Sequence, residues 1–174
     1  MKLSTDLHTS RITIRNHRAS DLPSVTAMWF DEENGRYMSD PTKEYVDEKY
    51  QKALDGLEDN PEGYYLVVEQ NDTKKIIGTC CIFPDEKKEC FDIGYCVHKD
   101  CWRKGYGTEI IALITAWVRE NGGAEIAAEV AKENTASRSL LESNGFKVKR
   151  ESSFKKYNMG IVFESYIYSL KIPH

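Results

Sequence analysis

The sequence predicts one mixed α/β domain, and three observations lead to this prediction. Segments in which apolar residues alternate, as in strands, are interspersed with segments whose apolar residues recur at helical spacing. The segments follow the order β-α-α-β-β-β-α-β-α-β-β, which is typical of a mixed α/β fold. The chain has 174 residues, about the length of a single domain that buries its own core.

The N-terminal half predicts two helices flanked by strands. Ser20, an acid and an early proline at 20–23 are typical of a helix start. Thr42 is expected to cap a second helix, whose apolar side includes Tyr50 and Leu54 and which ends at Asn60-Pro61. The strands expected in this half cover residues 11–15, 64–69 and 75–83.

The C-terminal half contains the strongest helical pattern, from about 105 to 121. Its apolar residues, from Ile110 to Val118, form one broad face, and Asn121-Gly122-Gly123 ends the helix. A shorter helix is expected at 135–143, closed by Asn144-Gly145. The strands expected in this half cover residues 91–98, 125–130, 146–151 and 162–171.

Composition and charge restrict the class of protein. Apolar residues make up 40% and charged residues 30% of the chain, as in soluble globular proteins. The net charge of −4 offers no basic excess, so we expect neither nucleic-acid nor membrane binding. The start of the chain lacks the apolar stretch of a signal peptide. We therefore expect a cytoplasmic protein whose five cysteines are reduced, with no disulfide framework and no metal site.

The segment 102–108, Trp-Arg-Lys-Gly-Tyr-Gly-Thr, lies between a strand and the strongest helix. Gly105 and Gly107 allow a ligand to approach the backbone, and successive N–H groups at a helix start attract an anion. Lys99, with three neighbouring basic residues, adds positive charge. The segment therefore indicates a phosphate-bearing ligand, with a tight turn that carries ordinary solvated charges as the alternative. The spacing fits neither a P-loop nor a dinucleotide fingerprint.

A second motif gives the loop its context. Residues 134–146, Asn-Thr-Ala-Ser-Arg-Ser-Leu-Leu-Glu-Ser-Asn-Gly-Phe, resemble the N-x-x-S/A-x-x-L-x-E-x-x-G-F signature of the GNAT superfamily of acyl-CoA-dependent N-acetyltransferases. Residues 91–97 resemble the central strand of that superfamily, and residues 102–108, here called the glycine loop, resemble its acyl-CoA loop. The resemblance is close over about a third of the chain and looser from Arg11 onward. The opening strand, Trp29-Phe30-Asp31 and Trp102 resemble the ribosomal-protein N-terminal acetyltransferase branch.

This resemblance implies a fold and an activity. The fold would be one acyl-CoA N-acyltransferase domain over residues 1–174, with a mostly antiparallel sheet of about six to seven strands and helices on both faces. The activity would be transfer of an acetyl group from acetyl-CoA to a primary amine. The expected partners are acetyl-CoA and an amine substrate, with a homodimer possible. A non-catalytic acyl-CoA-binding or sensor protein of the same fold is the alternative.

The resemblance also implies which residues bind the cofactor. Strand-end backbone groups would pair with the pantetheine arm, and the glycine loop would hold the phosphates. Asn134 would hydrogen-bond the cofactor, although asparagine is equally suited to capping the helix that follows. Trp102 replaces the usual Gln or Arg of the loop. The implied cofactor-binding residues are Cys96, Val97, His98, Arg103, Lys104, Gly105, Tyr106, Gly107, Thr108 and Asn134.

Two catalytic residues follow by resemblance. Asp92 stands where many members of the superfamily have a catalytic Glu, and its shorter side chain would act as a base through a water. A salt-bridged strand residue is the alternative. Leu141 occupies the position of the usual acidic Tyr, so Ser137 would meet the departing thiolate. Cys96 is expected in the core, which favours direct transfer over a covalent cysteine intermediate.

The amine substrate is less well defined by the sequence. Asp31, Glu32 and Glu33 lie in the loop after the first helix, where they would attract a cationic amine such as a polyamine or a basic peptide N-terminus. The alternative is a solvated acidic loop with no role in recognition.

Overall fold

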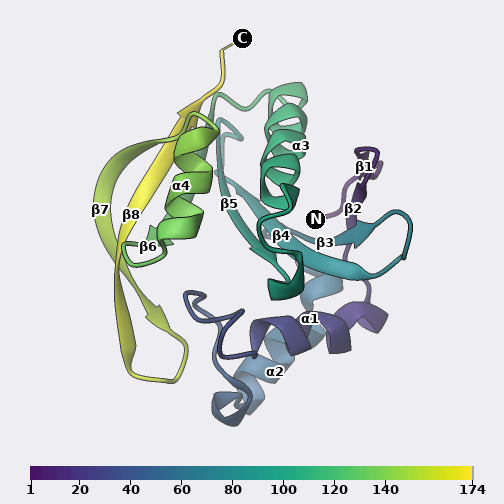
Figure 1. Cartoon of the computed structure of the whole chain (residues 1–174), viewed down its shortest axis with the longest axis vertical. Coiled ribbons are helices and arrows are strands. Elements are labelled where there is room, and N and C mark those ends of the chain that lie inside the picture. The colour runs from purple at the N-terminus through teal and green to yellow at the C-terminus, as the bar shows by residue number, and fades with distance from the viewer. Residues whose placement is uncertain (174) are drawn as a thin grey trace.

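The structure is a computed structural model that describes residues 1–173. An open sheet of eight strands, ordered β1-β2-β3-β4-β5-β6-β8-β7, forms its centre (Figure 1). The strands are β1 (Leu7–His8), β2 (Ile12–Asn16), β3 (Tyr64–Gln70), β4 (Ile76–Pro84), β5 (Cys90–Val97), β6 (Glu125–Ala131), β7 (Lys147–Lys156) and β8 (Ile161–Lys171). The α-helices are α1 (Leu22–Trp29), α2 (Glu48–Asp55), α3 (Tyr106–Glu120) and α4 (Thr135–Ser143).

The predicted fold class is confirmed, with one strand more than expected. Every strand pair of the described chain is antiparallel except β5 and β6, which run parallel. The additional strand is β1, which pairs with β2 through only two residues, Leu7 and His8. Two residues are too few to show an alternating pattern in a sequence.

Helices cover both faces of the sheet, as expected. On one face Phe91 of β5 packs against Trp117 of α3, with 5.9 Å between ring centroids. On the other face Trp29 of α1 donates a hydrogen bond from Nε1 to Oγ1 of Thr79 in β4, at 2.9 Å. Figure 1 shows α3 and α4 together over the upper part of the sheet, with α1 and α2 crossing below them.

The core under α3 follows the predicted apolar stripe. Ile110, Ile111, Ile114 and Val118 are all buried and belong to the main core cluster. Burial of such side chains contributes roughly 1.5–3 kcal/mol each. This packing fixes α3 firmly and so positions the loop at its N-terminus.

Two predicted boundaries were wrong. Thr42 does not cap the second helix, because a short 3₁₀ turn, Lys43–Tyr45, follows it and Val46 is extended. The helix begins at Glu48, and Asp47 caps it by accepting a hydrogen bond from Tyr50 N at 2.8 Å. The strand expected at 146–151 continues to Lys156, where mostly exposed polar side chains give no apolar alternation.

The two parallel strands pair only at their starts. Cys90, Phe91 and Asp92 of β5 lie opposite Glu125, Ile126 and Ala127 of β6. Beyond that point β5 stays paired with β4 as far as Val97, and β6 stays paired with β8 as far as Ala131. The sheet therefore opens between β5 and β6, and Figure 1 shows β3–β5 and β6–β8 diverging.

Candidate functional site

A cleft of about 1460 Å³ occupies the opening between β5 and β6 and extends over the sheet face beneath α1 and α2. This volume is larger than that of an ordinary small-molecule pocket and suits an elongated ligand. Most of the residues expected to bind the cofactor, and one of the two catalytic candidates, line it. These are Cys96, Val97, Arg103, Gly105, Tyr106, Gly107, Thr108, Asn134 and Ser137.

The loop before α3 and the first turn of the helix border the cleft. Arg103 and Gly105 have positive φ angles of 58° and 84°, which make the tight turn into the helix. The first helical hydrogen bond joins Glu109 N to Gly105 O at 3.2 Å. Within residues 1–173, the N–H groups of residues 106–108 therefore have no acceptor. Such a row of free N–H groups binds phosphate oxygens.

Gly107 lies where α3 and α4 approach closely. A Cβ atom at this position would lie 2.6 Å from Cδ2 of Leu140 in α4. That methyl group is the end of a flexible side chain, so a larger residue at 107 would require Leu140 to shift. The glycine therefore allows the two helices to pack closely beside the cleft.

Arg11, near the N-terminus, contacts the loop that precedes α3. Its Nε donates to Glu109 Oε1 at 2.5 Å and its Nη2 donates to Lys104 O at 2.8 Å. Its guanidinium also lies 4.3 Å from the centroid of the Tyr106 ring. The sequence did not single out Arg11 for this role, because its partners lie more than ninety residues away.

The end of β5 presents alternate backbone groups to the opening. His98 N donates to Ile77 O of β4 at 2.8 Å, and Cys96 O also lies against β4, beside Gly78. Since backbone groups alternate along a strand, those of Tyr95 and Val97 point away from β4, toward the opening. The backbone of Cys96 faces β4, and its side chain lies in the cleft wall.

Trp102 fixes the strand end instead of contributing a polar group to the loop. Its Nε1 donates to Val97 O at 2.7 Å, and Asn34 Nδ2 donates to the same oxygen at 3.2 Å. The carbonyl of Val97 is therefore occupied, which leaves its N–H for a ligand. The substitution at the usual Gln or Arg position thus has a clear structural role.

Three predicted residues do not line the cleft. His98 Nδ1 accepts a hydrogen bond from Asp100 N at 3.2 Å, and Lys104 Nζ donates to Asp100 O at 2.8 Å. Both side chains stabilise the turn that precedes α3. Asp92 lies on β5 at the last paired position, before the strands separate, and is also outside the lining.

Asn134 caps α4, as the alternative interpretation held. Its Oδ1 accepts a hydrogen bond from Ser137 N at 3.2 Å. The side-chain amide nitrogen has no acceptor among the described residues, and Asn134 also lines the cleft. Capping and ligand binding are therefore compatible, because they use different atoms of one side chain.

A pair of hydroxyl groups bridges the opening. Tyr95 on β5 and Ser137 on α4 place their side-chain oxygens 2.6 Å apart. Burial raises the pKa of Tyr95 to about 12, so the phenol stays protonated at neutral pH. Leu141 is fully buried, so the usual position of the acidic Tyr belongs to the core. The sequence singled out Ser137 as a candidate and did not single out Tyr95.

A second carboxylate lies near Asp92. Asp92 is opposite Ala127, so Glu129, two residues further along β6, projects from the same sheet face. Glu129 is exposed, lines the cleft and accepts a hydrogen bond from Ser165 Oγ at 2.6 Å. Burial raises the pKa of Asp92, and the charge of Glu129 raises it further. The sequence did not single out Glu129.

The acids of the first loop have mainly structural contacts. Asp31 forms an ion pair with Lys99 at 3.0 Å and accepts the backbone N–H of Asn34 at 2.8 Å. Glu33 pairs with the same lysine at 3.4 Å. Glu33 and Asp40 of this loop line the cleft; Asp40 accepts a hydrogen bond from Tyr50 OH, and burial raises its pKa.

The cysteines show no sign of a nucleophile or a metal site. All five are free. Burial raises the pKa of Cys96 to about 12, which keeps its thiol protonated, and Asn34 Nδ2 lies 3.1 Å from its sulfur. The described residues contain no group of three or more His, Cys, Asp or Glu side chains that could hold a metal ion.

These features are typical of a class of protein that binds a phosphate-bearing cofactor at a helix start, with the cofactor's arm between two splayed strands. Comparison with known proteins makes this specific. Residues 11–147 match the acetyltransferase (GNAT) domain. The chain therefore belongs to the GNAT acetyltransferase family, whose members use acetyl-CoA.

Individual relatives agree with this assignment. The chain is 26% identical to the uncharacterized N-acetyltransferase YoaA of Bacillus subtilis, over 96% of this chain and 97% of the relative. The yncA protein of Salmonella typhimurium, solved with its cofactor acetyl-CoA, has a similar fold (TM-score 0.70, 20% identity, 94% and 95% coverage). So has a Salmonella typhimurium acetyl transferase that modifies the N-terminal serine of ribosomal protein L7/L12 (TM-score 0.79, 14% identity, 97% and 100% coverage). None of the helices in the described part of the chain is long and apolar enough to span a membrane.

Proposed function

We propose that the protein transfers the acetyl group of acetyl-CoA to a primary amine by direct attack, with both substrates bound at once. The observation that carries this proposal is the row of free N–H groups at the start of α3, set at the end of the opening between β5 and β6. The five free cysteines agree with a cytoplasmic enzyme that uses no cysteine nucleophile. We also propose that the protein forms a homodimer.

We infer that acetyl-CoA binds along the opening between β5 and β6. Backbone N–H groups of residues 106–108, with Arg103, would hold the pyrophosphate. The backbone of Tyr95, the N–H of Val97 and the side-chain amide of Asn134 would bind the pantetheine arm. Cys96 forms part of the wall, and we assign His98 and Lys104 to holding the turn. When bound, the cofactor supplies an acetyl group activated as a thioester.

Asp92 is proposed to accept the proton of the attacking amine through a water, with Glu129 as its neighbour on the cleft side. A carboxylate with a raised pKa is a better base near neutral pH, and burial raises the pKa of Asp92. General-base catalysis is worth roughly 10²- to 10⁴-fold in rate. Glu129 is a second candidate for the same role because it lines the cleft directly.

Ser137 is proposed to donate a hydrogen bond to the departing sulfur. Its oxygen lies 2.6 Å from Tyr95 OH, so the phenol can orient it or supply the hydrogen bond in turn. The pair takes the place of the single tyrosine that the family usually has at position 141. Both hydroxyls stay protonated at neutral pH, so they act as donors throughout the reaction.

Asp40 is proposed to attract the amine, in place of Asp31 and Glu33, which both form ion pairs with Lys99. A carboxylate inside a cleft with aromatic walls favours a cationic amine. The fold shared with the enzyme that acts on ribosomal protein L7/L12 supports testing peptide N-termini beside small amines.

Thiol release from acetyl-CoA tests the proposal when it is measured against ribosomal-protein N-terminal peptides, polyamines and aminoglycosides. Turnover with at least one amine is the expected result. Tight binding of acetyl-CoA without turnover on any amine would instead favour a non-catalytic acyl-CoA-binding protein.

A further inference from the structure

His17 is a buried polar side chain without a hydrogen-bond partner. Only 5% of the residue is exposed, and neither Nδ1 nor Nε2 has a partner among residues 1–173. Burial lowers the pKa of the ring, so it is neutral, with one nitrogen a donor and the other an acceptor. Buried polar groups without partners are rare and point to a bound water or ligand. His17 also lines the cleft described above.

A straight row of residues across the sheet connects His17 to the opening at β5. Gly94 of β5 lies opposite Cys81 of β4, which lies opposite Tyr65 of β3. His17 follows β2 and donates its backbone N–H to Tyr65 O at 3.0 Å. Neighbouring strands are roughly 4.8 Å apart, so three spacings place His17 about 14 Å from Gly94. All four residues line the same cleft.

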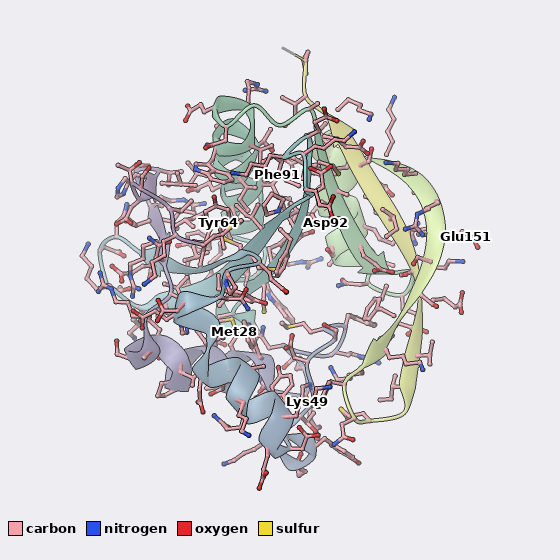
Figure 2. The ribbon with its side chains drawn as sticks, turned by 180° about the vertical axis from the view of Figure 1, so that it is seen from behind. Met28, Lys49, Tyr64, Phe91, Asp92 and Glu151 are labelled. Atoms are coloured by element: carbon pink, nitrogen blue, oxygen red, sulfur yellow. The ribbon has the colours of Figure 1, made fainter. Side chains whose placement is uncertain are left out.

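The walls of this far part of the cleft are apolar. Val25 of α1, Leu54 of α2 and Leu57 are buried and line it together with Tyr65. Tyr65 is fixed by Phe83, with ring centroids 5.6 Å apart and the rings nearly perpendicular. Figure 2 views the molecule from behind, with Asp92 marking the start of β5 in its upper half and Lys49 marking α2 below.

We propose that the acceptor is an elongated primary amine with an apolar body and a polar far end. Its amino group lies at Gly94, its body passes Cys81 and Tyr65 beneath α1 and α2, and its far end hydrogen-bonds to His17. Apolar walls and a neutral imidazole fit a hydroxyl or carbonyl at that end better than a second cation. The proposal rests on the proposed function and specifies the class of its amine substrate.

Calorimetric titration without acetyl-CoA tests the pocket independently of turnover. The probes are amino alcohols with a terminal amine and a terminal hydroxyl, of graded chain length, and n-alkylamines of equal length. We expect the tightest binding at the length that spans about 14 Å. At that length the hydroxyl should improve Kd roughly 3- to 10-fold over the matched alkylamine, as one net hydrogen bond does.

The variant His17→Leu should abolish this preference for the hydroxyl and leave the Kd of acetyl-CoA unchanged. His8→Leu is the matched control, because His8 is exposed, bonds to Thr13 and lies outside the cleft lining. His17→Leu should also be at least as stable as the wild type, since it removes a buried polar ring without partners. A clear loss of stability would mean that His17 has a structural role, and would overturn the proposal.

The outcomes separate this inference from the proposed function. Equal binding of amino alcohols and alkylamines at every length, unaffected by His17→Leu, would overturn the pocket assignment even if short amines are acetylated. Selective binding of the long amino alcohols without acetylation of any amine would support the pocket and contradict the proposed function.

Discussion

The contacts of Arg11 with the loop before α3 allow the effect of removing this side chain on stability to be estimated. Arg11 contacts Glu109, the carbonyl oxygen of Lys104 and the ring of Tyr106, all within or next to the first turn of α3. Arg11→Met keeps a side chain of similar length and removes all three polar contacts. The variant should loosen the loop while leaving the sheet and the core intact.

The expected loss of stability is about 2 kcal/mol. An exposed ion pair contributes roughly 0.2–1 kcal/mol, and a cation–π contact at an exposed site roughly 0.5–1 kcal/mol. A hydrogen bond from a charged group is worth roughly 1.5–3 kcal/mol. For the bond from Arg11 to the carbonyl oxygen of Lys104 we take about 1 kcal/mol, because the Arg11 side chain is 43% exposed and water weakens the interaction. For a chain of this size the change corresponds to a fall in Tm of about 4–8 °C.

Thermal unfolding and acetyl-CoA titration measure the two consequences. Binding must reorder the loosened loop, so Kd for acetyl-CoA should rise roughly 3- to 10-fold, whereas kcat at saturation should be nearly unchanged. Arg119→Met is the control, because Arg119 lies exposed at the far end of the same helix. Wild-type Tm and Kd in the Arg11 variant would show that the loop keeps its shape without these contacts.

Three further predictions concern the remaining polar groups. Asp92→Asn should lower kcat by about tenfold or more. Its Tm at pH 7 should be equal to or higher than that of the wild type, because burial raises the pKa of Asp92 and its ionised form opposes folding above that pKa. An unchanged kcat would show that Asp92 has no role in the mechanism. Hydrogen bonds from Lys149 of β7 and Lys171 of β8 lower the pKa of Glu125 to about 2. Glu125→Gln should therefore be less stable than wild type at pH 7, and the difference should vanish between about pH 4 and pH 2. A Tm difference that persists at pH 2 would contradict this. Tyr95→Phe and Ser137→Ala should each lower kcat roughly tenfold without changing KM for acetyl-CoA. If the two hydroxyls act together, the loss of kcat in the double variant should be smaller than the product of the two single losses. A loss equal to that product would mean that they act separately.

Local patterns in the sequence account for the fold and for the cofactor loop. The apolar spacing from Ile110 to Val118 predicts a buried helix, and the structure has one there. Gly105 and Gly107 predict a turn with free N–H groups at its end, and the positive φ of Gly105 agrees. Such features depend on residues close together in the chain, so they can be recognised without tertiary information.

Other parts of the site depend on contacts between distant segments. Arg11 meets Glu109, Tyr95 meets Ser137, and no periodicity or spacing in the sequence indicates either contact. The helix start at Thr42 was wrong for a related reason. Thr42 and Asp47 both have side chains that can cap a helix, and in the structure a 3₁₀ turn and the extended Val46 separate Thr42 from the helix that Asp47 caps.

The most direct test of the account is to measure both products of one reaction. The protein is incubated with acetyl-CoA and each amine of the panel, and released CoA thiol and acetylated amine are quantified together by absorbance and mass spectrometry. We expect equal amounts of thiol and acetylated amine for at least one primary amine, with both strongly reduced in the Asp92→Asn variant. Saturable binding of acetyl-CoA with neither product, for every amine tested, would contradict it.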